Sequence, residues 1–361
     1  MRTRSIVALI LAVTLTGCLP YSCRPETEES LFASDSLSRR VAQSTPADTL
    51  QAVWHTTGTD AHPIRYPRTV RFVSDSSLAV SDVERNSLFR FGPEGTVRRE
   101  LRDEAFAVPY LAGVRQDTLV VFNAEANRFD WVVDGRRLAD RARSFERPAE
   151  ETLVYALATD RHLYAKVMGD DTAPVILRLN NAGVPVAQAA LPGPYWRRAG
   201  VLRAWGDRLV SVSGFRPVVH TLPNEFGDGA TPDSLRLLGF DSPMLERSRA
   251  YAAGDAAKPP LLAASAAAVG DTLFVLNLRP GWVQIDVYDR TGGLQRRLIE
   301  RHGVGDRNFY PLDLDARRVD DGYEFAVTVR SPEPRLSLYR WNGPPPAADS
   351  AAATAQSGSA Q

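Results

Sequence analysis

Residues 117–123 read Asp-Thr-Leu-Val-Val-Phe-Asn, and residues 271–277 read Asp-Thr-Leu-Phe-Val-Leu-Asn. In both stretches an acidic turn residue precedes a short apolar run that ends in an amide, a pattern typical of a strand entered from a tight turn. Four other segments of the chain share the acidic turn and the apolar run, though not the final amide. The residues that open the six apolar runs are Leu78, Leu119, Leu163, Leu209, Leu273 and Tyr323.

The spacing of these six residues predicts a repeat architecture. Successive members lie 41, 44, 46, 64 and 50 residues apart. Periods of about 40–50 residues with four short strands each are typical of β-propeller blades. The widest interval is too short to contain a further blade. The sequence therefore predicts an all-β protein, a six-bladed β-propeller with four-stranded blades over residues 49–342.

The last blade lacks one strand in the sequence. Its runs are 312–319, 323–329 and 336–341, after which the chain becomes rich in Pro and Ala. Residues 50–55, before the first blade, form a spare strand. We expect this N-terminal strand to complete blade six and close the ring, which removes an exposed sheet edge.

Blade five begins with an unusual run, Leu-Leu-Ala-Ala-Ser-Ala-Ala-Ala-Val, at residues 261–269. Alanine has the highest helix propensity, so a helix is the competing interpretation. The preceding Pro259-Pro260 and the repeat frame favour an inner strand, where small side chains suit the crowding near the axis.

Residues 1–17 have the form of a secretory signal. Arg2 and Arg4 precede an apolar stretch of eleven residues, which is too short to span a bilayer about 30 Å thick. The segment ends Leu15-Thr16-Gly17-Cys18, which resembles the lipobox of bacterial lipoproteins. That resemblance implies a signal peptide over 1–17 and a diacylated N-terminal Cys18, and hence an anchor in the cell envelope. A plain secretory signal is the alternative.

The resemblance also bears on the location and on the flanking segments. Leu19 is not the acidic residue that retains some lipoproteins at the inner membrane, so the outer membrane, facing the periplasm or the cell surface, is favoured. Residues 18–48 are expected to be a flexible tether, and residues 343–361 a disordered Pro/Ala/Ser-rich tail.

Charge and cysteine content exclude some classes of function. The chain has 43 Lys+Arg against 43 Asp+Glu, which argues against a nucleic-acid binder. Its two cysteines are Cys18 and Cys23, so a lipidated Cys18 leaves no intrachain disulfide. No cofactor is expected, because the sequence contains no haem-attachment motif or zinc-protease spacing.

Blades one, two and five share a finer pattern. A strand that ends in Asp82 or Asn123 is followed four residues later by Asn86 or Asn127, and Asn277 is followed by a strand and a glycine turn. This resembles the NHL-type repeats of six-bladed propellers. The resemblance implies the propeller fold but no single activity, because such proteins range from peptide binders to lactone hydrolases.

Asp82, Asn123, Ser213 and Asn277 each lie four residues after the start of their run. One interpretation is a ring of oxygen ligands for a central cation, as in the calcium-dependent lactonase-type propellers that they partly resemble. The other is turn chemistry, in which such side chains bond to nearby backbone. We favour turn chemistry, and keep Asp82, Asn123 and Asn277 as metal candidates only if the protein is an enzyme.

Residues 223–260 form the longest insertion in the repeat. Ser242-Pro243 is a helix-start signal, so a short helix is expected over 243–252. Insertions in repeat proteins often form the binding face. Met244 and Tyr251, together with Arg279 and Trp282 in the next loop, are the candidate contact residues.

These observations predict a non-catalytic, lipid-anchored propeller of the cell envelope. We expect it to bind a protein, peptide or glycan on one face of the ring. The alternative is a metal-dependent hydrolase or lyase, similar to lactonases, that uses the axial funnel. Three or more carboxylate, amide or imidazole groups converging at the axis would favour the enzyme. No catalytic residue is predicted.

Overall fold

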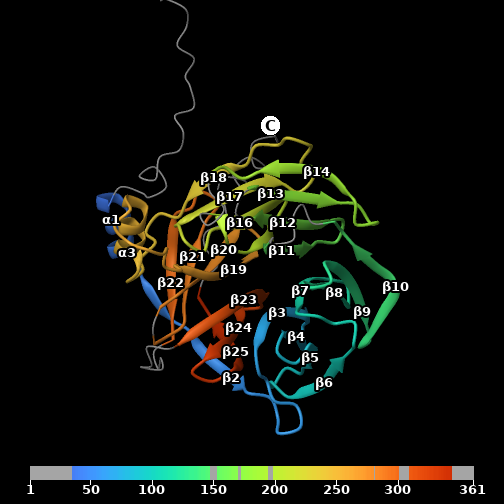
Figure 1. The fold of residues 1–361 in the computed structure, drawn as a ribbon. Helices are drawn as coiled ribbons and strands as arrows, with labels where there is room; N and C mark the ends of the chain where they lie inside the picture. The colour runs from blue at the N-terminus through green and yellow to red at the C-terminus, as the bar shows by residue number, and fades with distance from the viewer. Residues whose placement is uncertain are drawn as a thin grey trace, which may run out of the picture.

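The computed structural model describes residues 35–146, 153–169, 172–193, 198–279, 281–300 and 309–343. This part of the chain forms six sheets arranged in a ring (Figure 1). The first strand of each sheet contacts the first strands of its neighbours around the axis. The predicted fold class, an all-β six-bladed propeller with four-stranded blades, is confirmed.

Each of the first three blades is formed by four strands that are consecutive in the sequence. Blade one consists of β3 (Pro67–Ser74), β4 (Ser77–Asp82), β5 (Ser87–Phe91) and β6 (Val97–Arg102). Blade two consists of β7 (Pro109–Arg115), β8 (Thr118–Asn123), β9 (Arg128–Val133) and β10 (Arg136–Ser144). Blade three consists of β11 (Leu153–Ala158), β12 (Leu163–Gly169), β13 (Thr172–Leu179) and β14 (Pro185–Ala190).

The last three blades include the long insertion and the closure. Blade four consists of β15 (Leu202–Trp205), β16 (Arg208–Val212), β17 (Val218–Pro223) and β18 (Asp233–Arg236). Blade five contains β19 (Ala263–Val269), β20 (Thr272–Asn277), β21 (Gln284–Tyr288) and β22 (Leu294–Ile299). Blade six contains β23 (Tyr310–Val319), β24 (Gly322–Ser331) and β25 (Arg335–Trp341).

The N-terminal segment closes the ring, as predicted. Strand β2 (Gln51–Thr56) pairs antiparallel with β25 and becomes the fourth strand of blade six. Just before it, β1 (Ala47–Thr49) pairs in parallel with β22 as a fifth strand of blade five, which the sequence analysis did not foresee. Between the two strands, Leu50 is only 2% exposed and packs in the core. This short segment therefore joins the last two blades.

Part of the range expected to be a tether, residues 18–48, is regular structure. Besides β1, it contains helix α1 (Asp35–Ser44), where the sequence analysis expected no helix. Val41 of α1 packs against the core shared by blades four and five, and the Gly239 amide donates to Ser38 Oγ at 3.2 Å. The helix is amphipathic, and its attachment depends on these contacts with distant blades, which local composition does not reveal.

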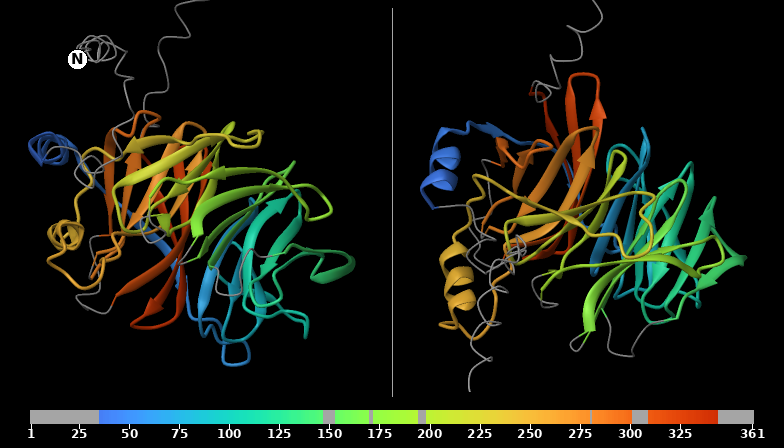
Figure 2. Two further views of the ribbon diagram at one scale, coloured as in Figure 1. Left: turned by 45° about the horizontal axis from the view of Figure 1, so that its top comes forward. Right: turned by 90° about the horizontal axis from the view of Figure 1, so that it is seen from above.

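The helix predicted in the insertion is present as α3 (Leu245–Ala253), on the same flank of the ring as α1 but separated from it in Figure 2. It begins two residues later than predicted, and Ser242 is not its N-cap. Instead, the Met244 amide donates to Ser242 Oγ and the Leu245 amide to the Ser242 carbonyl, so this serine forms a turn ahead of the helix. The helix ends at Gly254, whose φ of 89° suits glycine.

The Ala-rich run forms β19, the innermost strand of blade five, so the strand interpretation is confirmed. Crowding at the axis also explains Gly113 of β7: a Cβ there would collide with the backbone carbonyl of Ala158 on β11.

Aromatic rings fill much of the core between blades. Phe274 of blade five lies 5.0 Å, centroid to centroid, from both Tyr323 and Phe325 of blade six. Apolar packing between blades therefore stabilises the ring.

Within the described ranges, no helix is long and apolar enough to span a membrane.

Candidate functional site

All six innermost strands begin on the same side of the ring, and the second strand of each blade ends there. The register shows this directly: Pro67 of β3 lies opposite Asp82 of β4, and Pro109 of β7 opposite Asn123 of β8. We call this side, where the innermost strands begin, the entry face. The hairpins that join the first two strands of each blade, such as the one at Ser76, lie on the opposite face.

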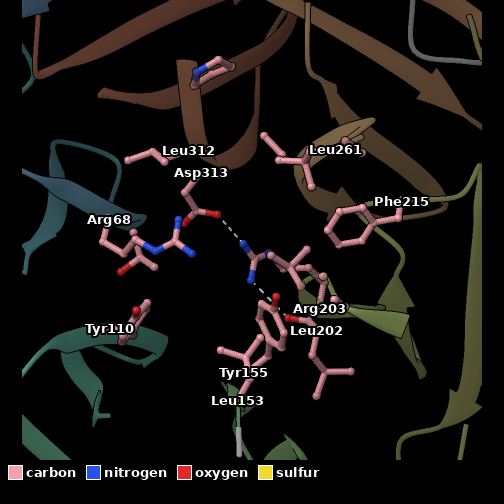
Figure 3. Close-up of a pocket in the computed structure, with 18 of the residues that line it drawn as sticks. Arg68, Tyr110, Leu153, Tyr155, Leu202, Arg203, Phe215, Leu261, Leu312 and Asp313 are labelled. Carbon is pink, nitrogen blue, oxygen red and sulfur yellow. Dashed lines mark hydrogen bonds and ion pairs between the residues drawn. The ribbon is translucent and has the colours of Figure 1, made fainter. Parts of the chain in front are cut away.

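A cavity of about 470 Å³ lies on the axis at the entry face (Figure 3). All six blades line it, mainly through the first residues of their innermost strands. Its apolar walls include Leu153, Leu202, Phe215, Leu261 and Leu312. Its polar lining includes Arg68, Thr69, Arg71, Tyr110, Tyr155, Arg203, Tyr251, Tyr310 and Asp313. The volume lies within the range of small-ligand sites, about 300–1,000 Å³.

Two arginines of this cavity share a buried carboxylate. Asp313 of β23 accepts from Arg71 Nη1 through Oδ2 at 2.8 Å, and from Arg203 Nη2 through Oδ1 at 2.5 Å. The Val70 amide and the Ser265 hydroxyl donate to the same two oxygens, at 3.0 and 2.6 Å. We call Arg71, Arg203, Ser265 and Asp313 the axial cluster. It joins blades one, four, five and six.

The charges of the axial cluster hold its groups ionised. Burial by itself would raise the pKa of Asp313, but Arg203 and Arg71 outweigh it and the pKa is lowered. For Arg203, burial and then the neighbouring charge of Arg71 lower the pKa to about 10. Arg203 therefore stays protonated at neutral pH, and Asp313 stays a carboxylate.

Arg68, at the second position of β3, is the third arginine of the cavity. Its guanidinium lies 5.7 Å from the ring centroid of Tyr110 and points into the cavity (Figure 3). Burial works against its charge, yet the charge and the hydrogen bond of Tyr110 leave the pKa of Arg68 raised. In the described structure, no carboxylate pairs with it. The described lining thus has three arginines and one carboxylate, which makes the cavity cationic.

Two of the residues considered for a cation ring, Asp82 and Ser213, bond to nearby backbone. Asp82 Oδ2 accepts from the Arg65 and Tyr66 amides at 2.7 and 3.0 Å. Its Oδ1 accepts from the amides two and three residues further along the chain, both at 3.1 Å. Ser213 Oγ likewise accepts from amides two and three residues ahead. These contacts are the turn chemistry that we favoured, and in Asp82 they also fasten the connection that enters β3.

The two asparagines both bond to a carboxylate at the entry face, but only Asn123 also accepts from a backbone amide, and Asn277 Oδ1 has no hydrogen-bond partner in the part of the chain that the structure describes. Asn123 accepts from the Ala107 amide and donates to the Asp130 carboxylate. Asn277 donates to Asp286 at 3.0 Å, and burial raises the pKa of Asp286 to about 6. Nowhere in the described residues do three or more His, Cys, Asp or Glu side chains gather as metal ligands. Neither asparagine lines the axial cavity.

Of the four predicted contact residues, the structure places one in the cavity. Tyr251 of α3 lines it, so the insertion does reach the axis. Met244 is partly buried against the core of blades four and five. Arg279 pairs with Asp241 at 2.7 Å beside the insertion, and Trp282 is 39% exposed. These two residues follow β20 and therefore lie on the entry face, outside the cavity.

Sequence reasoning missed Arg68, Arg71, Arg203 and Asp313. A signal was present: each is a charged residue in the innermost strand of its blade. Side chains of such strands alternate between faces, so a charge there faces either a neighbouring blade or the axis. Only the ring geometry shows that these charges meet.

Comparison with known proteins identifies no family. No protein-family model matches the chain, and no curated protein matches it. The resemblance to NHL repeats thus gains no support beyond the six-bladed architecture.

Solved structures similar to the chain include glutaminyl cyclase from Myxococcus xanthus, at 9% identity and a TM-score of 0.43, covering 82% of this chain and 97% of that one. Virginiamycin B lyase from Staphylococcus aureus matches at 10% identity and 0.49, covering 80% and 98%. A protein of unknown function from Bacteroides caccae matches at 11% and 0.45, covering 71% and 83%. At these levels the likenesses assign no activity to this chain.

Proposed function

We propose that this protein is a non-catalytic binding propeller of the cell envelope, anchored through lipid on Cys18, that holds a peptide segment of an envelope partner at the entry face. The observation that carries the proposal is the axial cavity: a formed site of about 470 Å³ with an excess of arginine and apolar walls. Sites of this kind bind ligands through a few convergent polar groups on an apolar surface.

The rim of the cavity supports a binding role for this face. Leu153 is 51% exposed and Tyr310 is 36% exposed, and both line the opening. Exposed apolar side chains beside a concave site favour contact with a partner. The signal-like sequence of residues 1–17 and the lipobox-like residues 15–18 support the envelope location.

The hydrolase or lyase alternative finds less support in the donor set. The described lining of the cavity contains one carboxylate, Asp313, and no imidazole or side-chain amide. Both oxygens of that carboxylate are engaged by arginines. We therefore do not extend the proposal to metal-dependent hydrolysis at the axis.

Site-specific crosslinking in the native envelope tests the proposal. A photoreactive phenylalanine analogue replaces Leu153 or Tyr310 at the rim, and Ser76 on the opposite face in the control. We expect a discrete crosslinked partner from both rim positions and none from position 76. Crosslinks that are equal from both faces, or that arise only from position 76, would contradict binding at the entry face.

A further inference from the structure

Arg68 differs from the other two arginines of the cavity in its partners. Arg71 and Arg203 both bind Asp313. Arg68 is half-buried, and its contacts within the described residues are the ring and hydroxyl of Tyr110. A partly desolvated guanidinium without an anion is costly, because the lost hydration is not replaced by a counter-charge.

Asp313 cannot supply that counter-charge, because its two oxygens are already occupied. Each oxygen accepts from one arginine and one further donor: Oδ2 from Arg71 and the Val70 amide, Oδ1 from Arg203 and the Ser265 hydroxyl. Four short donors satisfy the usual capacity of a carboxylate. The positive charge of Arg68 is therefore left for a group that enters the cavity.

The walls beside Arg68 restrict what that group can be attached to. Leu312 lies near Arg68 in Figure 3, Leu153 lies farther along the wall beside Tyr155, and Phe215 and Leu261 form the opposite side of the cavity. A strongly hydrated polyanion would lose its water against these walls without receiving donors in return. A single carboxylate on an apolar body fits better, since the planar guanidinium matches a carboxylate with two parallel hydrogen bonds.

We propose that Arg68 anchors the carboxylate of a ligand whose apolar body lies between Leu153, Leu312 and Phe215. This inference deepens the proposed function and rests on it, because it assigns the chemistry by which the entry face recognises its partner. The same chemistry belongs to the C-terminus of a peptide that ends in an apolar residue and to a small free acid with an apolar group.

Calorimetric titration of the soluble protein, residues 19–361, with matched probes tests the proposal. The probes are N-acetyl-Leu-Phe with a free C-terminus, the same dipeptide as its C-terminal amide, and 3-phenylpropionate. We expect the free acid to bind at least about 10-fold more tightly than the amide, since a hydrogen-bonded charge pair contributes more than about 1.4 kcal/mol. Equal binding of acid and amide, or no binding of either, would overturn the proposal.

Variants identify the anchor. Arg68→Gln should bring the affinity for the acid down to that for the amide, while Arg68→Lys should keep part of the difference. The control is Arg330→Gln, an exposed arginine over the Tyr66 ring at 4.7 Å, which removes the same charge outside the cavity. An equal loss in both glutamine variants would assign the effect to the general charge of the protein and overturn the role of Arg68.

A second variant keeps the test independent of the folding of Arg68→Gln. Ala264→Phe reduces the cavity volume while Arg68 remains, so it should weaken the acid and the amide together. Unchanged binding of the acid in this variant would mean that the probe binds outside the axial cavity, which would overturn the proposal. If 3-phenylpropionate binds as tightly as the dipeptide acid, the ligand is a free acid; if it binds at least about 10-fold more weakly, the ligand is a peptide terminus.

The two proposals can fail separately. Rim crosslinks to a partner together with equal acid and amide binding would remove the carboxylate inference and keep the binding face. Selective binding of the acid without any rim crosslink would keep the anion site and remove the envelope partner.

Discussion

Two buried polar clusters of this propeller differ in how they accommodate charge. In the axial cluster, two arginines meet the Asp313 carboxylate. Between blades three and four, Arg198 Nη1 donates to His220 Nε2 at 2.7 Å, and Lys166 lies close enough to lower the pKa of His220. We call Lys166, Arg198 and His220 the basic cluster. Both clusters are buried, so burial alone does not determine the ionisation state.

The pKa shifts show the consequence. Asp313 keeps a lowered pKa because Arg203 and Arg71 overcome its burial. In the basic cluster, burial and then the charge of Arg198 lower the pKa of Lys166 well below its usual value. Burial, Arg198 and Lys166 together lower the pKa of His220 to about 3. The axial cluster thus keeps its charges, whereas His220 is neutral at pH 7 and burial disfavours the charged form of Lys166.

The largest expected effect comes from breaking the axial cluster. Asp313→Asn leaves Arg71 and Arg203 buried without their counter-charge, and the amide group that replaces one oxygen repels a guanidinium. Removing one partner of a buried ion pair costs about 3–5 kcal/mol, so we expect a loss of this size in the free energy of unfolding, measured in urea at pH 7. The control is Asp233→Asn, which breaks an ion pair with Arg208 at the surface.

The control sets the scale for that experiment. The Asp233 side chain is 76% exposed, and exposed pairs contribute about 0–1 kcal/mol. If the two variants lost the same stability, the axial cluster would contribute no more than a surface pair, and the contrast between the two clusters would disappear.

The next largest effect is the contribution of His220 in the basic cluster to the pH dependence of stability. Arg198 can only donate, so His220 Nε2 must accept and the folded imidazole is neutral. The pKa of His220 is about 3 in the folded protein and about 6.5 when unfolded. Between these values the unfolded state binds one proton more, so His220 reduces stability as the pH falls, by about 1.4 kcal/mol per pH unit.

His220→Gln keeps an acceptor for Arg198 and cannot be protonated, so its stability should fall less than that of the wild type from pH 6.5 to 4. The comparison is made between the two proteins, because Asp286, with a pKa raised to about 6, contributes the opposite slope between pH 4 and 6 in both. His55→Gln, at an exposed histidine, is the control and should follow the wild type. Parallel pH profiles for the wild type and His220→Gln would show that folding does not lower the pKa of His220.

The contrast between the clusters also explains what the sequence could predict. The blade number and the closing strand follow from a local signal, an acidic turn before an apolar run, repeated at a regular period. The axial cluster has no local signal of that kind, because Arg71 and Asp313 are 242 residues apart and meet only when the ring closes. Ser242-Pro243 predicts where the short helix α3 lies. It does not predict the residue at which α3 begins, because Ser242 forms a turn ahead of the helix and does not cap it.

The smallest effect concerns Lys166, one of two lysines in the chain; the other, Lys258, is exposed. Lys166 Nζ donates to the Gly200 carbonyl at 2.7 Å and lies 5.3 Å from the centroid of the Tyr155 ring. Lys166→Met fills a similar volume and removes an amine whose charged form is disfavoured by burial. We expect stability at pH 7 to rise by about 1 kcal/mol or stay unchanged, despite the lost hydrogen bond.

The same substitution changes the alkaline slope. The pKa of Lys166 is lowered on folding, so between the folded value and about 10.5 the unfolded state binds the extra proton and stability rises with pH. Wild type and Lys258→Met should therefore gain stability from pH 7 to 9.5, whereas Lys166→Met should not. A loss of several kcal/mol at pH 7 in Lys166→Met would mean that the ammonium is charged and paired in the folded protein. Lys166 would then keep its charge while buried, as Arg203 does in the axial cluster.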